Sequence, residues 1–265
     1  MISLIELLKE AVSKPKAIIL AGAPGAGKGY ILRGLDLAGL KVLNVDDIYV
    51  PLLQKANVTL DLKNATPEER SEQAKQMAAA NKQFKGDVEA TIEGKESFIL
   101  DGTGASYNST AKLKNELEEA GYEVFMLYVY TDLQRSLSQN QDRYEKSEGK
   151  DRSLAPAIVM RTWKSVTDNL PKYAELFGNN FVAVANTLDD KMQDIDKIIK
   201  KYLTPFDPQG TKPKTPKEQA KSDARKAKDK EEIQAMLSDD FIYGVIEYTI
   251  SKEEAQMRIG KFLNS

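Results

Sequence analysis

A glycine-rich run that ends in a lysine is the first feature of this 265-residue sequence that could do chemistry. Because glycine has no Cβ, Gly22, Gly25 and Gly27 allow a tight turn whose backbone N–H groups converge on an anion, and Lys28 adds a positive charge. The run is Gly22-Ala23-Pro24-Gly25-Ala26-Gly27-Lys28-Gly29, followed by Tyr30. It fits the phosphate-binding pattern G-x-x-x-x-G-K-[ST] except at the last position, which lacks a hydroxyl. We therefore predict that residues 22–30 bind the phosphates of a nucleotide.

Acidic residues follow two further apolar runs. Asp46 and Asp47 follow the run 41–45, and Asp101 follows the run 97–100. A carboxylate facing a γ-phosphate can accept the proton of an attacking hydroxyl, and an acid on a neighbouring strand can hold Mg²⁺ directly or through water. We expect one of the two adjacent aspartates to face the site, and Asp101 to serve the metal through water. Asp47 and Thr103 are candidate substrate contacts.

Basic residues gather on either side of a glycine-containing loop between two predicted helices. Guanidinium groups that close over transferred phosphate oxygens stabilise the charge that spreads over them. We therefore predict a lid at about residues 143–156. The basic residues of this region are Arg135, Arg143, Lys150, Arg152, Arg161 and Lys164.

The composition excludes several kinds of chemistry. The chain has no Cys and no His, so thiolate metal sites, disulfides and imidazole bases are impossible. A formal charge of −2, from 38 basic and 40 acidic residues, gives no whole-chain reason to expect nucleic acid as a partner. No apolar run approaches the roughly 18–20 residues of a membrane helix, and the N-terminus lacks the features of a signal peptide. We expect a cytoplasmic protein with no membrane partner.

Short apolar runs alternate with helical patterns along the first 200 residues. Apolar runs without interspersed polar residues are typical of strands buried on both faces. The alternation of such strands with helices favours a parallel sheet covered by helices. We predict an α/β fold, a P-loop NTPase-type three-layer αβα sandwich with a mostly parallel five-stranded sheet. The ligands of such sheets bind beyond the carboxyl ends of the strands. The predicted strands are 17–21, 41–45, 97–100, 124–130 and 181–185, and the helices about 28–38, 66–92, 109–120, 131–146, 155–176 and 188–202.

The composition changes near residue 204. Residues 204–216 hold four prolines and indicate a linker after a main domain, 1–203. Residues 217–265 are predicted to form a small helical C-terminal appendage, whose last helix, 252–263, is capped by Ser251. The apolar run 241–250 in this appendage is a possible docking surface for a protein partner.

The order of these parts resembles the zeta-toxin-like and polynucleotide-kinase-like P-loop kinases over roughly residues 15–185. The resemblance implies ATP and Mg²⁺ as cofactors and Asp46 as the base that takes the proton of the acceptor hydroxyl. It matches Arg143 and Arg152, with Lys150 as an alternate, to lid residues that contact the phosphates. It implies transfer of the γ-phosphate to a hydroxyl of a nucleotide sugar, a nucleoside or nucleotide, or a polynucleotide 5′ end.

Two other functions stay open. The phosphate loop also resembles that of adenylate kinases, which place Gly after the lysine and then Thr, so a nucleoside monophosphate kinase is one alternative. The other is a non-catalytic nucleotide-binding or assembly protein, which Gly29 and Tyr30 favour because neither is the Ser or Thr that normally supplies a hydroxyl to the metal.

The helical insertion at 55–92 is expected to form a wall of the acceptor pocket. It carries Lys63, Arg70, Lys75, Lys82 and Lys85 but few aromatic residues, Phe84 among them, which slightly disfavours single-stranded nucleic acid as the acceptor; a solvated helix face explains these lysines and the arginine equally well.

Overall fold

The computed structural model of the chain describes residues 14–35, 37, 40–62, 65–148, 151–187 and 215–265. These residues form a six-stranded sheet with the order β2-β3-β1-β4-β5-β6, and every neighbouring pair of strands is parallel. All five predicted strands are present, and the sixth comes from the C-terminal segment. The strands are β1 (Lys16–Gly22), β2 (Lys41–Asn44), β3 (Phe98–Asp101), β4 (Glu123–Tyr130), β5 (Phe181–Ala185) and β6 (Thr249–Ile250).

Helices occupy most of the chain between the strands. The first of them, α2, is shorter than the predicted span of 28–38, and the predicted helix at 188–202 lies outside the described residues. So does most of the predicted linker, up to residue 214. The helices are α2 (Lys28–Gly34), α3 (Asp46–Lys55), α4 (Pro67–Glu93), α5 (Tyr107–Glu119), α6 (Leu133–Lys146), α7 (Pro156–Phe177), α9 (Pro216–Met236), α10 (Asp239–Ile246) and α11 (Lys252–Leu263).

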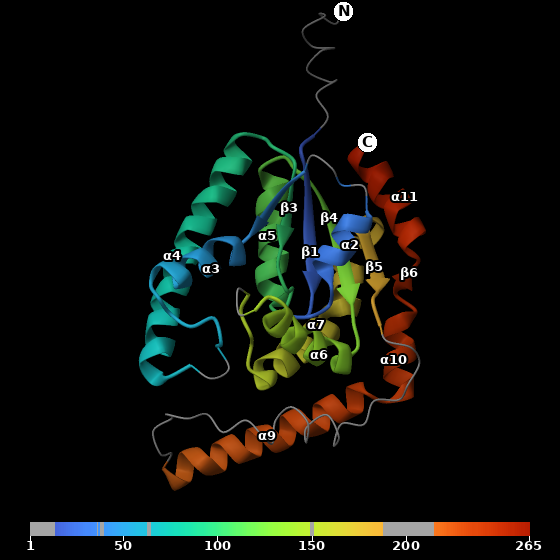
Figure 1. Cartoon of the computed structure of the whole chain (residues 1–265). Helices are drawn as coiled ribbons and strands as arrows, with labels where there is room; N and C mark the ends of the chain where they lie inside the picture. Colours follow the sequence, from blue (N-terminus) through green and yellow to red (C-terminus); the bar gives the residue numbers. More distant parts are fainter. Residues whose placement is uncertain (1–13, 36, 38–39, 63–64, 149–150, 188–214) are drawn as a thin grey trace, which may run out of the picture.

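Helices cover both faces of the sheet, so the predicted αβα sandwich is confirmed (Figure 1). Successive side chains of β1 point to opposite faces, as they must in a strand. Ala17 and Ile19 pack with α5 and α7, whereas Ile18 and Leu20 pack with α2 and α11. This two-sided burial explains why β1 is continuously apolar.

The α3–α4 pair forms a wall beside the β2 edge of the sheet (Figure 1). The two helices share a separate small core around Tyr49, Leu53 and Ala80. Helix α4 begins in a capping box, in which the Thr66 hydroxyl accepts a hydrogen bond from the Glu69 N–H and the Glu69 carboxylate accepts one from the Thr66 N–H. Because α3 follows the carboxyl end of β2, the α3–α4 wall stands beside the carboxyl ends of β2 and β3.

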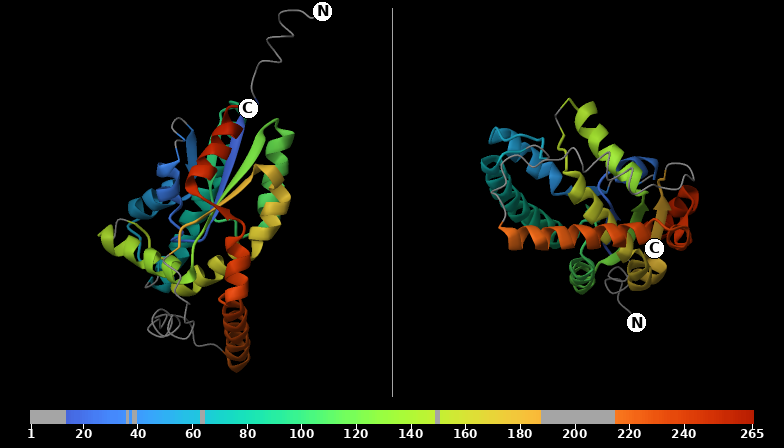
Figure 2. Two further views of the ribbon diagram at one scale, coloured as in Figure 1. Left: turned by 90° about the vertical axis from the view of Figure 1, so that its right-hand side faces the viewer. Right: turned by 90° about the horizontal axis from the view of Figure 1, so that it is seen from below.

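The C-terminal segment packs on the main core rather than beside it. Strand β6 pairs with β5, and the ring of Phe262 on α11 lies 4.9 Å, centroid to centroid, from that of Phe125 on β4. The last turn of α9 packs against α6 and α7, and Lys164 pairs with Glu232 at 2.8 Å. Helix α9 runs beneath α6 and α7 in Figure 1 and crosses the molecule when seen from below in Figure 2. The division into residues 1–203, 204–216 and 217–265 stays a prediction.

None of the described helices combines the length and the apolar character that crossing a membrane requires.

Candidate active site

The glycine-rich loop connects β1 to α2, as the sequence predicts, and is held from outside by α6 and the end of β5. The Ser136 hydroxyl donates to the Pro24 carbonyl at 2.5 Å, and the Asn186 side-chain amide donates to the Ala26 carbonyl at 2.7 Å. Gly27 has a φ of +78°, and a Cβ there would lie 2.3 Å from the Asn186 amide nitrogen. The loop is thus already folded in a conformation that other residues would disturb.

Lys28 lies between the loop and the end of β3. Its ammonium group donates to the Gly22 carbonyl at 3.4 Å and lies 3.7 Å from Oδ1 of Asp101. Both side chains are largely buried, at 17% and 15% exposure. A positive charge therefore sits at the mouth of the loop, where the phosphates of a nucleotide would lie.

Asp101 ends β3 with one oxygen in a hydrogen bond and the other 3.7 Å from the Lys28 ammonium group. Its Oδ2 accepts a hydrogen bond from the Asn44 side-chain amide at 2.9 Å, whereas Oδ1 is buried and receives no hydrogen bond from any described residue. Burial raises the pKa of Asp101, Lys28 lowers it, and the nearby Asp46 and Asp47 raise it further. A buried carboxylate oxygen beside other acids suits a cation or its water ligand.

Asp46 is the first residue of α3, directly after β2. Its backbone N–H donates to the Asn44 side-chain oxygen at 2.9 Å, so Asn44 links both carboxylate-bearing residues. Its Oδ2 accepts a hydrogen bond from the Arg152 guanidinium at 2.7 Å, whereas its Oδ1 is buried and has no partner among the described residues. Asp46 can therefore accept a further hydrogen bond on Oδ1.

Of the two adjacent aspartates, Asp46 is the one that is paired and partly buried, whereas Asp47 is exposed. Thr103 is also exposed, and its backbone carbonyl accepts a hydrogen bond from the Gly22 N–H at 3.0 Å. Asp47 lies close enough to Asp101 to raise its pKa. Both predicted substrate contacts thus lie around the same edge of the sheet.

The lid loop reaches the site through Arg152 and is attached to the α3–α4 wall. The Ser153 hydroxyl donates to Asp61 at 2.8 Å, and the Ser153 N–H donates to the Leu60 carbonyl at 3.0 Å. The Arg152 guanidinium also lies 5.8 Å from the ring centroid of Tyr49 on α3. These contacts bring the lid over the carboxyl end of β2.

Arg143, the other lid arginine, is paired elsewhere in this structure. It forms an ion pair with Asp151, and its side chain is 58% exposed. Lys150 lies outside the described residues. Of the two lid arginines, both of which the structure describes, Arg152 is thus the one that contacts Asp46.

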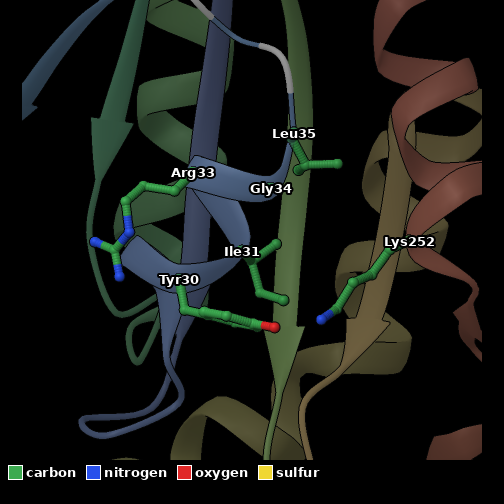
Figure 3. Close-up of a pocket in the computed structure, with 6 residues that line it drawn as sticks. All are labelled: Tyr30, Ile31, Arg33, Gly34, Leu35 and Lys252. Carbon is green, nitrogen blue, oxygen red and sulfur yellow. The ribbon is translucent and has the colours of Figure 1, made fainter.

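Tyr30 lies in the first turn of α2 and is directed toward the C-terminal segment (Figure 3). Its ring is 57% exposed, and the ammonium group of Lys252 lies 4.5 Å from the ring centroid. The residue that directly follows the glycine-rich run therefore contacts α11.

Sequence reasoning missed Asn44, Ser136, Ser153 and Asn186. Asn44 and Asn186 each stand at the carboxyl end of a predicted strand, and that position was an available signal. Ser136 and Ser153 have no such signal, because their partners are backbone or side-chain groups more than 90 residues away.

No group of three or more Asp, Glu, His or Cys residues among those described could hold a metal ion by itself. A Mg²⁺ ion that keeps several water ligands and depends on substrate phosphates needs no such group. The buried Oδ1 atom of Asp101, which has no hydrogen-bond partner among the described residues, would fit a water ligand of such an ion.

These features define a class of protein. A glycine-rich loop after the first strand of a parallel sheet, a lysine at its end and an acid on the neighbouring strand are the parts of a P-loop protein. The family model described as Zeta toxin matches residues 4–198, which is more than half of the chain. The chain therefore belongs to the Zeta toxin family.

Three solved structures are similar to the chain at low identity. The AvrRxo1-ORF1:AvrRxo1-ORF2 complex with sulphate ions has a TM-score of 0.50 at 16% identity, and the match covers 97% of this chain and 83% of that chain. The PezAT toxin–antitoxin system of Streptococcus pneumoniae has a TM-score of 0.45 at 17% identity, with 88% and 93% covered. The Pnkp1/Rnl/Hen1 RNA repair complex has a TM-score of 0.45 at 17% identity, with 62% and 48% covered. The comparison with curated proteins found no match.

Proposed function

We propose that the protein is an ATP-dependent kinase that transfers the γ-phosphate of ATP to a hydroxyl group. The observation that carries the proposal is the pair Asp101 and Asp46, which Asn44 links and which each keep a buried carboxylate oxygen without a hydrogen-bond partner among the described residues; Asp101 also lies 3.7 Å from Lys28. Buried acceptors of this kind are costly unless a ligand satisfies them. Membership of the Zeta toxin family supports the same reaction class.

In this proposal the loop amides and Lys28 hold the triphosphate. When bound, Mg²⁺ neutralises charge on the β- and γ-phosphates. Asp101 would accept hydrogen bonds from the water ligands of the ion through Oδ1, and the lack of another hydrogen-bond donor to this atom among the described residues supports that role. The raised pKa of Asp101 agrees with this role, because burial and the neighbouring acids make the ionised carboxylate costly until a cation arrives.

Asp46 acts as the base. The acceptor hydroxyl donates to Oδ1 of Asp46, its oxygen forms a bond to the γ-phosphorus, and the bond from that phosphorus to the β–γ bridging oxygen breaks. The hydroxyl proton passes to Asp46, and ADP leaves with the electrons of the broken bond. Holding the two reactants in line is the main contribution of the protein.

Arg152 has a place in this step because it already contacts the base. Its ion pair with Asp46 fixes the carboxylate orientation before substrate binds. A γ-phosphate near Asp46 would compete for the same guanidinium, which has further N–H donors. The lid arginine is therefore the proposed group that stabilises charge on the transferred phosphoryl group.

The proposed acceptor is the hydroxyl of a small nucleotide-like molecule, with a nucleotide sugar favoured over a polynucleotide end. On α4, which forms the acceptor wall, Lys75 pairs with Glu72 and Lys85 pairs with Glu89. These lysines have acidic partners on their own helix, so the wall offers less uncompensated charge to a phosphate backbone than the sequence suggests. Nucleosides, nucleotides and polynucleotide 5′ ends remain alternative acceptors.

The experiment is incubation with γ-labelled ATP and Mg²⁺ against panels of nucleotide sugars, nucleosides, nucleoside monophosphates and 5′-hydroxyl oligonucleotides. We expect Lys28→Ala to abolish transfer. Asp46→Asn should lower turnover by at least a hundredfold with nearly unchanged ATP affinity, because general-base catalysis contributes on the order of 10²–10⁴. Lys112→Ala, on the far helix α5, is the matched control.

Three results would point away from the proposal. Full turnover by Asp46→Asn would remove the base assignment. ATP binding without transfer to any acceptor would support a non-catalytic nucleotide-binding protein instead. Transfer only to nucleoside monophosphates would support a nucleoside monophosphate kinase.

A protein partner at the C-terminal segment is also part of the proposal. Tyr243 on α10 and Met257 on α11 are 67% and 66% exposed. Large apolar side chains exposed to this extent suit a docking surface.

A further inference from the structure

A cavity of about 280 Å³ lies between the phosphate-loop helix α2 and the C-terminal helix α11. Figure 3 shows that Tyr30 extends from the first turn of α2 toward Lys252, the first residue of α11. The cavity is lined by Tyr30, Ile31, Arg33, Gly34, Leu35 and Lys252. It therefore combines an aromatic ring and apolar walls with two cationic side chains.

The topology places this cavity on one defined side of the phosphate loop. Asp101 ends β3 and Asp46 comes after β2, and both of these strands lie on one side of β1 in the sheet. Helix α11 comes after β6, which lies on the other side of β1, beyond β4 and β5. If the γ-phosphate lies at the two carboxylates, the α-phosphate and nucleoside of the same linear molecule extend toward β4 and β5. Tyr30 is only two residues beyond Lys28, so the cavity begins beside the α-phosphate end.

The charges of the cavity suit that end of the nucleotide. Lys252 forms no ion pair with an acidic residue in the part of the chain that the structure describes and instead lies over the Tyr30 ring, whereas the Arg33 guanidinium extends away from Lys252 (Figure 3). A cation held over an aromatic face by a weak interaction remains available to a phosphate. The ring of Tyr30, with Ile31 beside it in the lining of the cavity, offers an apolar surface for a sugar.

We propose that Tyr30 and Lys252 form a subsite for the α-phosphate and sugar of the donor nucleotide, so that the C-terminal segment completes the site. This inference rests on the proposed kinase function. Lys252 lies outside residues 4–198, which the family model matches. The proposed subsite also gives Tyr30 a role, because its aromatic ring lies where α11 supplies a cation.

The test compares two ligands that share only the terminal phosphates. ATP carries the α-phosphate and the nucleoside, whereas inorganic pyrophosphate offers two phosphates to the loop and Lys28 alone. Affinities are measured by titration calorimetry with the full-length chain, directly for ATP and by competition for pyrophosphate. The variants are Tyr30→Ala, Lys252→Ala and Lys28→Ala, with Lys252→Arg as the conservative change and Lys261→Ala, at the other end of α11, as the control.

We expect Tyr30→Ala and Lys252→Ala each to weaken ATP binding about three- to tenfold, as loss of a single cation or ring contact does. Pyrophosphate binding should change by less than about twofold, and Lys252→Arg should recover most of the loss. Lys261→Ala should bind both ligands as the unchanged protein does. Lys28→Ala should weaken both ligands at least tenfold.

Distinct results would overturn the two proposals. Unchanged ATP affinity in both Tyr30→Ala and Lys252→Ala, with both ligands weakened by Lys28→Ala, would refute the subsite and leave the kinase proposal standing. Equal weakening of ATP and pyrophosphate by Lys252→Ala would also refute it, because Lys252 would then act as a general charge. Unchanged binding of both ligands by Lys28→Ala would refute the nucleotide site itself.

Discussion

Gly27→Ala offers a direct test of the claim that the phosphate loop is already folded and clamped. Gly27 has a left-handed backbone, with a φ of +78°, which costs a residue with a Cβ about 1 to 2 kcal/mol. The new Cβ would lie 2.3 Å from the Asn186 amide nitrogen. Asn186 must then move and lose its 2.7 Å hydrogen bond to the Ala26 carbonyl, which is worth about 1 kcal/mol.

The two effects together predict that Gly27→Ala lowers the free energy of unfolding by about 2 to 3 kcal/mol, and ATP affinity should fall with it. Gly86→Ala is the matched control, because Gly86 lies inside α4 and a Cβ there meets nothing within 4 Å. That change should stabilise the protein by about 0.5 to 1 kcal/mol. Both values come from urea unfolding, with ATP affinity measured by calorimetry. If Gly27→Ala were as stable as the unchanged protein and bound ATP equally well, the reasoning about the clamped loop would be wrong.

Three further predictions concern the site and its lid. Arg152→Ala should destabilise the protein by about 1 to 3 kcal/mol, because it leaves a largely buried carboxylate unpaired, whereas Arg143→Ala, which breaks an exposed pair, should cost less than about 1 kcal/mol in urea unfolding. As pH rises from 4 to 7, the free energy of unfolding of Asp101→Asn should increase relative to that of the unchanged protein; unfolding experiments at several pH values measure this difference. The pKa of Asp101 is raised in the folded state, so the folded chain binds more protons than the unfolded chain and loses stability as that proton leaves. A constant difference across this range would contradict the buried, ionised carboxylate. Ser153→Ala should cost about 1 kcal/mol and increase protease cleavage of the lid, since it removes the 2.8 Å hydrogen bond to the α3–α4 connection; Ser138→Ala, on α6, should leave cleavage unchanged.

The sequence predicted the five main strands because each is a short apolar run between helical patterns. Strand β6 could not be predicted, because two residues carry no periodicity, and Thr249–Ile250 becomes a strand only through its pairing with β5. The C-terminal helix was predicted from its cap at Ser251, but its packing was not, since Phe262 meets Phe125 across 137 positions of sequence.

For the site, the sequence predicted which segments meet but not how their side chains pair. Lys28 and Asp101 were expected at neighbouring strand ends, and the structure brings them to 3.7 Å. Which lid cation contacts Asp46 depends on the path of the loop: Arg152 does, whereas Arg143 pairs with Asp151. Nothing in the sequence separates these two arginines, because both choices depend on long-range geometry. The catalytic and substrate roles of these residues stay predictions.

The packing of α11 has a consequence for the order of folding. Lys16, the first residue of β1, donates through its ammonium group to the Ser265 hydroxyl at 2.9 Å, a contact across 249 residues. Contacts this distant in sequence close late, because the entropy of a long loop must be overcome before they form. We expect refolding to end in a slow phase in which the last helix docks on β4 and β5. If Lys252 contributes to the nucleotide site, full ATP affinity should return only in that phase, after the phosphate loop itself has formed.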